Sequence, residues 1–343
     1  MMHAYKHAMN MINHSPLAAA TYFLMDRDGA EVMLFVLKGT WRTGSGGKLS
    51  IADEQMPVIS EPVYRGEPGK SSLVYDTDAV LEKPGTDCVL IGHARTLKPH
   101  LACVDVTFGV GPIIKQLRVF GDRRWKKGIL GSASIIKIRP IEEIPLIWEN
   151  AFGGIDVSHE DSSKHEICRE NPVGKGFIAA KSNIDIVGQL LPNIEDPANL
   201  IKNPKQRPKP VGFGMIAPYW QPRISYAGTY DEQWRKYISP LLPEDFDTRF
   251  NLLAAPGLST KTHLQGNERV LVEGASKHGR LLFDLPGITP KVTVRRWGHE
   301  TDLPMCLDTV VVEPDNERFM LTWRGVWNVH GKVHQLISVR VET

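Results

Sequence analysis

The sequence has no long apolar run and no block of charge of one sign, and these absences exclude several classes of protein. No window approaches the roughly 20 apolar residues that a helix needs to span a bilayer. Polar and basic residues such as His3, Lys6 and His7 interrupt the N-terminus, so it does not resemble a secretory signal. The formal net charge is only +2, and nothing demands a nucleic acid or an anionic membrane. We therefore expect a cytoplasmic protein that binds neither nucleic acid nor membrane.

Cysteine is scarce, and the four residues, Cys88, Cys103, Cys168 and Cys306, form no CxxC pair. A disulfide scaffold is a poor fit for a chain of 343 residues, because such scaffolds are typical of small secreted domains. We therefore expect reduced and mostly buried thiols.

The chain is longer than most proteins with a single hydrophobic core, and its length of 343 residues favours two lobes over one. The apolar share of 42% and the charged share of 23% are ordinary for a folded protein. The 30 glycines and 24 prolines are scattered and not repetitive, which indicates many short strands and turns.

Alternation of apolar and polar residues at period two predicts strands in both halves of the chain. The clearest is a hairpin, in which residues 21–25 and 31–38 are strands joined at Asp28-Gly29. Further predicted strands are 88–92, 104–110, 113–120, 135–138, 281–285, 291–297, 306–312, 318–329 and 333–341. We expect the last three to form a meander.

The middle of the chain, residues 151–256, is rich in proline and has few clean alternations. It holds one helix signal over residues 230–237, with Thr229 as N-cap, Glu232 completing a capping box, and Pro240 beyond the end. We predict a mainly β protein with a two-lobed, sandwich-like architecture and few short helices. Its parts are an N-terminal β lobe (1–150), this irregular Pro/Gly-rich middle (151–256), and a C-terminal β meander (257–343) packed against the first lobe.

Catalytic and ligand-binding signatures are weak. Gly69-Lys70-Ser71 lacks the earlier glycine and the following helix of a phosphate-binding loop. His159, His165 and Cys168 are the best candidate zinc ligands, but their spacing matches no standard structural site, and a polar surface loop explains them better. A hydrolase whose site is assembled from distant residues such as Cys168, His165 or Glu244 stays an alternative. We assign no catalytic residue, no cofactor and no metal.

Several short motifs follow one another in a defined order. They are Lys38-Gly39-Thr40-Trp41, Lys83-Pro84-Gly85-Thr86-Asp87, Gly121-Asp122-Arg123-Arg124-Trp125, Trp148-Glu149-Asn150-Ala151-Phe152-Gly153-Gly154, Glu170-Asn171-Pro172-Val173-Gly174-Lys175-Gly176-Phe177, the block Pro210–Pro256, Gly266-Asn267-Glu268, Leu307-Asp308-Thr309-Val310 and Leu321-Thr322-Trp323-Arg324. The series resembles an uncharacterised bacterial domain family that is found beside type VI secretion spike genes. The similarity covers about residues 20 to 342.

This resemblance implies a non-enzymatic adaptor or chaperone. Its expected partners are a secreted toxin effector, bound through a PAAR-like tip domain, and the VgrG spike protein onto which the effector is loaded. A structural component that travels with the spike is a further alternative. The resemblance carries over no established binding residues.

The block Pro210–Pro256 concentrates aromatic side chains and arginines, which are enriched at interface hot spots. The candidate partner-binding residues within it are Trp220, Arg223, Tyr226, Tyr230 and Trp234. Alternatively, these rings pack the joint between β layers with arginines stacked on them, and we expect this of most of them.

Arg123 and Arg124 pose the same choice between an interface and an internal role. Either guanidinium could face a carboxylate of a partner. A structural salt bridge within the chain is the alternative, and we favour it.

Overall fold

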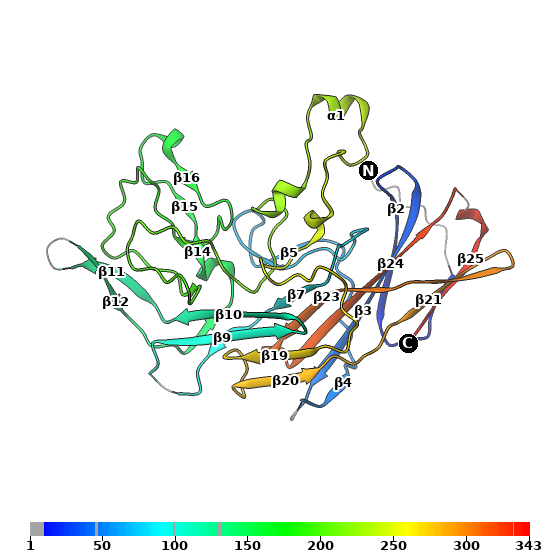
Figure 1. Cartoon of the computed structure of the whole chain (residues 1–343), viewed down its shortest axis with the longest axis horizontal. Coiled ribbons are helices and arrows are strands. Elements are labelled where there is room, and N and C mark those ends of the chain that lie inside the picture. The colour runs from blue at the N-terminus through cyan, green and yellow to red at the C-terminus, as the bar shows by residue number, and fades with distance from the viewer. Residues whose placement is uncertain (1–9, 45–46, 99, 129–131, 332) are drawn as a thin grey trace.

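Three sheets of four, five and six strands form the framework of the fold. The computed structural model describes residues 10–44, 47–98, 100–128, 132–331 and 333–343. Within these ranges there are five further sheets of two strands each and one short α-helix. The protein is therefore mainly β, as predicted, with several sheets and an irregular middle (Figure 1).

The six-stranded sheet combines early and late segments of the chain in the order β2-β3-β24-β23-β7, with β4 also paired to β3. Its strands are β2 Ala18–Met25, β3 Glu31–Thr43, β4 Leu49–Ile51, β7 Asp87–Leu90, β23 Cys306–Glu313 and β24 Arg318–Asn328. β3 lies between β2 and β24 and is buried along nearly its whole length. A strand covered on both faces needs a nearly continuous apolar run, and β3 reads EVMLFVLKGTWRT.

The predicted hairpin of β2 and β3 is confirmed. Its turn closes at Gly29, whose φ of 81° is one that glycine adopts without strain. Along its other edge β3 pairs with β24, from Val32 opposite Asn328 to Arg42 opposite Arg318. The first and third predicted regions thus contribute strands to one sheet, and the division at residues 150 and 256 stays a prediction.

The five-stranded sheet has the order β18-β10-β9-β19-β20 and shares one hydrophobic core with the six-stranded sheet. Its strands are β9 Cys103–Val110, β10 Ile113–Phe120, β18 Ile194–Glu195, β19 Arg269–Glu273 and β20 Arg280–Asp284. Phe283 on β20 stacks on Phe319 on β24, with ring centroids 4.8 Å apart. Because each sheet has an apolar face, packing the two faces together removes both from water.

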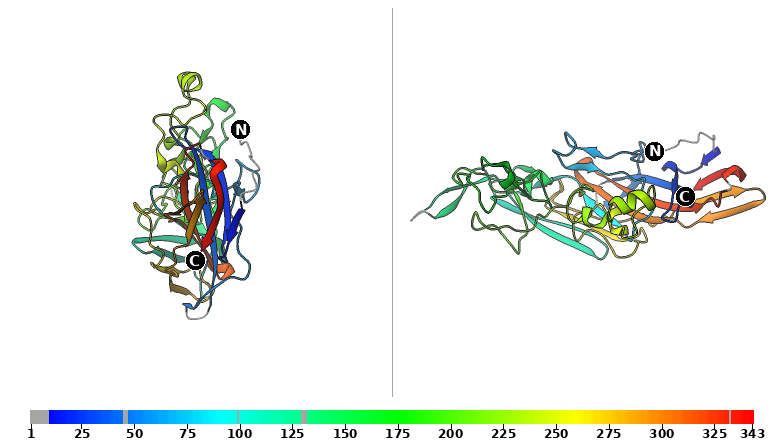
Figure 2. Two further views of the ribbon diagram at one scale, coloured as in Figure 1. Left: turned by 90° about the vertical axis from the view of Figure 1, so that its right-hand side faces the viewer. Right: turned by 90° about the horizontal axis from the view of Figure 1, so that it is seen from above.

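The four-stranded sheet has the order β1-β25-β21-β22 and lies at one end of the molecule (Figure 2). Its strands are β1 Asn10–Asn13, β21 Lys291–Arg296, β22 His299–Leu303 and β25 Leu336–Glu342. The expected meander of the last three strands is therefore wrong, because β23 and β24 are neighbours but β25 pairs with β21 and β1. Both edges of β24 are paired, one with β23 and the other with β3, so β25 pairs with other strands.

The middle of the chain forms short pairs and single turns. The two-stranded sheets, the first three of which involve only earlier residues, are β5 Val63–Tyr64 with β6 Leu73–Tyr75, β8 His93–Arg95 with β13 Glu143–Pro145, β11 Arg123–Lys127 with β12 Ala133–Lys137, β14 Phe152–Gly153 with β17 Lys175–Gly176, and β15 Ile155–Asp156 with β16 Glu166–Ile167. The 3-10 helices are η3 Trp148–Asn150, η4 Ser162–Lys164, η5 Arg223–Tyr226, η6 Thr248–Asn251, η7 Pro314–Asn316 and η8 Val333–Gln335. A second, smaller core under these turns contains Trp125, Phe152, Cys168, Leu191 and Ile201.

The helix predicted over residues 230–237 is present as α1, Glu232–Tyr237, but its predicted cap is wrong. Asp231 is the N-cap, and its side chain accepts a hydrogen bond from the Trp234 amide at 2.8 Å. The Thr229 hydroxyl instead donates to Asp245 at 2.7 Å. An Asp two residues later offers the stronger acceptor, which releases Thr229 for a contact across the loop. None of the helices in the described ranges combines the length and the apolar character required to cross a membrane.

Candidate functional site

Four of the sequence motifs meet inside the six-stranded sheet. Lys38-Gly39-Thr40-Trp41 lies in β3, Lys83-Pro84-Gly85-Thr86-Asp87 leads into β7, Leu307-Asp308-Thr309-Val310 lies in β23, and Leu321-Thr322-Trp323-Arg324 lies in β24. These segments are far apart in sequence but belong to one sheet. Their charged side chains are buried.

A chain of polar contacts connects the buried charges of these motifs. Lys83 forms an ion pair with Asp87 at 2.9 Å and donates to the Thr309 hydroxyl at 2.9 Å. Thr309 donates to Asp308 at 2.9 Å, and Asp308 forms an ion pair with Arg324. Burying a charge is costly unless a partner and hydrogen bonds satisfy it, and here each charge has both.

The network extends to the loop that ends the block Pro210–Pro256. The Asp87 carboxylate accepts hydrogen bonds from the amides of Leu253 at 3.0 Å and Ala254 at 3.2 Å, and from the Ser259 hydroxyl at 2.7 Å. Asp87 therefore holds this loop against the edge of the sheet. Since Asp87 is fully buried, we assign it an internal role.

The electrostatic balance at Asp308 keeps this carboxyl ionised. Burial by itself would raise the pKa of Asp308, but the charges of Arg324 and Lys83 outweigh that effect and hold the pKa below its usual value. A second buried pair lies beside it, because Lys38 contacts Asp78 at 2.5 Å and Arg324 donates to the Asp78 carbonyl at 3.1 Å. The charged residues of the motifs thus form a buried network of ion pairs and hydrogen bonds inside the protein.

Lys115 on β10 holds both ends of the block Pro210–Pro256. Its ammonium group donates to the Gly212 carbonyl at 2.9 Å and to the Pro256 carbonyl at 2.8 Å. Burial lowers the pKa of Lys115 to about 8, and the charge of Asp196 offsets only part of that effect. The block is therefore anchored from β10 as well as from β7.

Trp220 and Arg223, two of the proposed partner-binding residues, lie inside the protein. Trp220 is fully buried and packs edge to face on Trp148, with ring centroids 6.0 Å apart. Arg223 forms a buried ion pair with Asp76 at 2.6 Å and donates to the Ile216 carbonyl at 2.6 Å. The ring contact of Trp220 is of the kind that the packing alternative describes, and neither side chain is at the surface.

Arg123 and Arg124 separate in the same way. Arg123 is buried, forms an ion pair with Glu195 and donates to the Pro192 carbonyl at 2.6 Å. Arg124 is its neighbour on β11, and its side chain is exposed. The alternation of side chains along a strand explains the difference. Whether Arg124 contacts a partner stays a prediction.

The other three proposed residues lie in or beside a loop that projects from the body of the protein (Figure 1). We call residues 228–246 the projecting segment; it contains α1. Tyr230 is 52% exposed and packs on the half-buried Trp234, with ring centroids 4.6 Å apart. Tyr226 precedes the segment and carries the Arg249 guanidinium 4.3 Å above its ring. Tyr237, which sequence reasoning did not select, is 74% exposed.

The projecting segment is closed at its base. Thr229 donates to Asp245 through its amide at 2.9 Å and its hydroxyl at 2.7 Å. The Asp247 amide donates to the Tyr226 carbonyl at 3.0 Å. Further out, the Trp234 indole donates to the Leu241 carbonyl at 2.9 Å. The segment therefore displays its exposed rings from a tied base.

A groove of about 360 Å³ lies between the base of the projecting segment and the β2–β3 turn. Its lining residues are Asp26, Arg27, Asp28, Leu81, Glu82, Leu242, Phe246, Thr248, Asn251 and Val326. The groove thus joins an apolar surface to a mostly acidic one.

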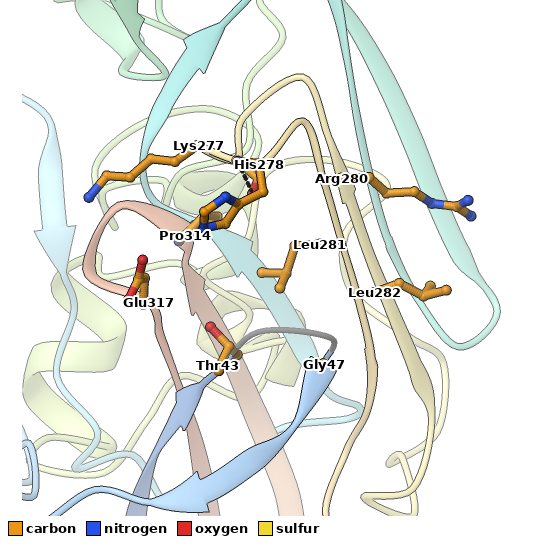
Figure 3. Close-up of a pocket in the computed structure, with 11 residues that line it drawn as sticks. Thr43, Gly47, Lys277, His278, Arg280, Leu281, Leu282, Pro314 and Glu317 are labelled. Carbon is orange, nitrogen blue, oxygen red and sulfur yellow. Dashed lines mark hydrogen bonds between the residues drawn. The ribbon is translucent and has the colours of Figure 1, made fainter. Parts of the chain in front are cut away.

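A larger hollow of about 570 Å³ lies between the end of β3, the β19–β20 hairpin and the turn after β23 (Figure 3). Lys277 and Arg280 extend from it in opposite directions. Gly44 and Gly47 line the hollow. Its titratable groups do not converge on one point, as catalytic groups must.

The candidate zinc ligands do not come together. His165 contacts the carbonyl of His159 through its ring at 2.8 Å, whereas Cys168 is buried in the smaller core. In the described part of the chain, no group of three or more His, Cys, Asp or Glu side chains is arranged to hold a metal ion. Burial raises the pKa of the Cys168 thiol to about 11, which opposes the thiolate that a nucleophilic cysteine needs.

Trp297 is a further exposed aromatic residue that sequence reasoning did not select. It lies in the β21–β22 turn and is 65% exposed. In the described ranges its one aromatic neighbour is His334, whose ring packs edge to face against it. Its exposure could have been predicted from its position before Gly298, because a side chain at a hairpin turn lies far from the hydrophobic core.

The fold and the surface define a mainly β, multi-sheet protein with a buried charged centre and an exposed aromatic loop. The family described as "Uncharacterized protein conserved in bacteria (DUF2169)" matches residues 28–324, and the chain belongs to this family. That description states no activity and no partner. Neither the curated proteins nor the solved structures include a match to the chain.

Proposed function

We propose that this protein is a cytoplasmic, non-enzymatic adaptor that binds another protein through its projecting segment. More specifically, the partner is a type VI secretion effector, bound through a PAAR-like tip domain and loaded onto the VgrG spike. The observation that carries the proposal is the exposure of Tyr230 and Tyr237, at 52% and 74%, on a loop with a hydrogen-bonded base.

The physical argument is that large aromatic side chains gain little by facing water. Tyrosine supplies a wide, rigid contact area and loses little conformational entropy on binding. The base of the segment is ordered before any partner arrives, so less ordering free energy is lost when the complex forms. Two tyrosines displayed in this way support a protein-binding surface.

The burial of the motif charges supports a binding role over catalysis. Lys83, Asp87, Asp308 and Arg324 are charged groups of the kind that active sites use, yet all four are buried and paired with one another. A substrate does not reach them while the sheet is intact. Their contacts instead hold the loop at 253–259 in place.

Co-expression with the effector encoded beside this protein tests the proposal. We expect the two chains to co-elute from a size-exclusion column, and the double variant Tyr230→Ala/Tyr237→Ala to weaken binding by about 30-fold or more, as expected for hot-spot residues. The control is Trp297→Ala, which removes a ring that is 65% exposed at another surface.

Separate elution of the two chains in several buffers would contradict the proposed partner. Co-elution that Trp297→Ala abolishes and the tyrosine variant leaves intact would instead assign binding to the four-stranded sheet.

A further inference from the structure

The groove beside the projecting segment has the chemistry to receive part of a partner chain. We propose that it binds an apolar side chain of a polypeptide that is flanked by lysine or arginine. This inference names the recognition chemistry of the proposed adaptor surface and in that sense rests on the proposed function, although its own test does not need the effector.

The apolar part of the groove comes from three segments of the chain. Leu242 and Phe246 belong to the projecting segment, Leu81 precedes β7, and Val326 lies on β24. Leu242 and Val326 are each 39% exposed. A volume of about 360 Å³ is at the low end for ligand pockets, so it accommodates one large side chain and its neighbours and not a folded element.

The rim of the groove has an excess of negative charge. Asp26, Asp28 and Glu82 face a single cation, Arg27. Asp26 is already used, because it accepts hydrogen bonds from the backbone amides of Asp28 at 3.0 Å and Ala30 at 2.8 Å.

The carboxylates of Asp28 and Glu82 are exposed, and within the described ranges neither has a hydrogen bond or an ion pair. The guanidinium of Arg27 donates to the Glu244 carbonyl and, in the described part of the chain, forms no ion pair with either carboxylate. Two unpaired carboxylates beside an apolar surface are complementary to an apolar residue flanked by cations.

Two contacts brace the walls of the groove. Arg27 links the β2–β3 turn to the projecting segment at Glu244. Asn251 on η6, just after the projecting segment, donates to the Glu82 carbonyl at 2.6 Å and so joins this part of the block to the loop before β7. A groove held from both sides is largely formed before binding, which favours affinity.

The test uses the full chain and two fluorescein-labelled peptides, Gly-Lys-Leu-Lys-Gly and Gly-Glu-Leu-Glu-Gly. Fluorescence anisotropy is measured at low salt and again at 0.5 M salt. We expect the lysine peptide to bind at least tenfold more tightly than the glutamate peptide, and the difference to shrink at high salt because salt screens exposed charges.

The charge-reversal variant Asp28→Lys/Glu82→Lys is expected to lose this preference. The control variant Asp53→Lys/Glu160→Lys changes the net charge equally at two other exposed positions and should keep it. Thermal unfolding of both variants confirms that each is folded. A third variant, Leu242→Ser, should weaken the lysine peptide by about tenfold without changing the net charge.

Equal binding of the two peptides, no binding of either, or an equal effect of the two charge variants would each overturn the inference. The effector co-expression gives an independent result. If the lysine peptide binds the groove but the effector does not co-elute, the groove stands and the proposed partner fails. If the effector binds and the peptides do not, the adaptor stands and the groove fails.

Discussion

Lys83 and Asp87 form an ion pair at 2.9 Å although the lysine side chain is only 2% exposed and the aspartate side chain 0%. Lys83 precedes β7 and Asp87 begins it. Asp87 also fixes the loop at Leu253 and Ala254, so one carboxylate connects a cation, a strand and the end of the proline-rich block. We therefore expect this site to govern the stability of the fold.

Replacing Asp87 with asparagine leaves Lys83 buried without its ion-pair partner. We expect the free energy of unfolding of Asp87→Asn to fall by about 3–5 kcal/mol, measured by urea denaturation. The control is Asp284→Asn, which breaks the exposed Arg269–Asp284 pair at 2.8 Å. Exposed pairs are screened by water, so this variant should unfold like the wild type. Comparable losses in the two variants would contradict the assignment.

The strands of this protein are largely readable from its sequence, because a strand with one buried face alternates at period two and a strand covered on both faces, such as β3, is a nearly continuous apolar run. The run predicted over 113–120 is β10, and the run over 318–329 is β24 within one residue. Which strands pair with each other is harder to predict from the sequence. Nothing local indicates that β24 pairs with β3 or that β25 leaves for another sheet, since those choices depend on which edges remain free.

The candidate site shows the same limit. Lys83 and Thr309 are joined by a hydrogen bond but are 226 residues apart in the sequence, so no motif spacing could have linked them. Trp220 and Tyr230 belong to one aromatic block, yet one is fully buried and the other is 52% exposed. Composition gave both the same prediction, because aromatic residues are suited to cores and to interfaces alike.

Acid should destabilise the protein through Asp308. Arg324 and Lys83 hold the pKa of this carboxyl below its usual value despite burial. A carboxyl with a depressed folded-state pKa stabilises the fold above its unfolded pKa of about 3.9 and loses that effect as the pH falls through the folded pKa.

Urea midpoints measured from pH 7 to pH 3 should therefore drop below about pH 4 in the wild type. Asp308→Asn should be less stable at pH 7, with a shallower drop, whereas Asp53→Asn at the surface should follow the wild type. A drop of equal size in Asp308→Asn would mean that other carboxyls carry the acid sensitivity.

Gly85 is placed where no larger residue fits. A Cβ atom at this position would lie 2.0 Å from the Thr260 carbonyl oxygen, in the loop that bonds to Thr86. We expect Gly85→Ala to lose about 3 kcal/mol of stability, because the backbone of the loop must move. Gly66→Ala is the matched control, since its Cβ would make only an ordinary contact of 3.6 Å with Ser71. Thermal unfolding separates the two, and equal melting temperatures would disprove the close approach.

Asp231 should control the order of the projecting segment without affecting the rest of the fold. Its side chain caps α1 by accepting from the Trp234 amide at 2.8 Å, and losing such a cap costs about 1 kcal/mol. Because the segment is tied at its base by Thr229 and Asp245, we expect the loss to remain local. Amide hydrogen exchange across α1 should speed up about fivefold in Asp231→Ala, while exchange in β24 stays unchanged. The control Asp231→Asn keeps a capping side chain and should exchange like the wild type. If Asp231→Ala instead exchanged faster in the five-stranded and six-stranded sheets as well, the projecting segment would unfold together with the rest of the protein.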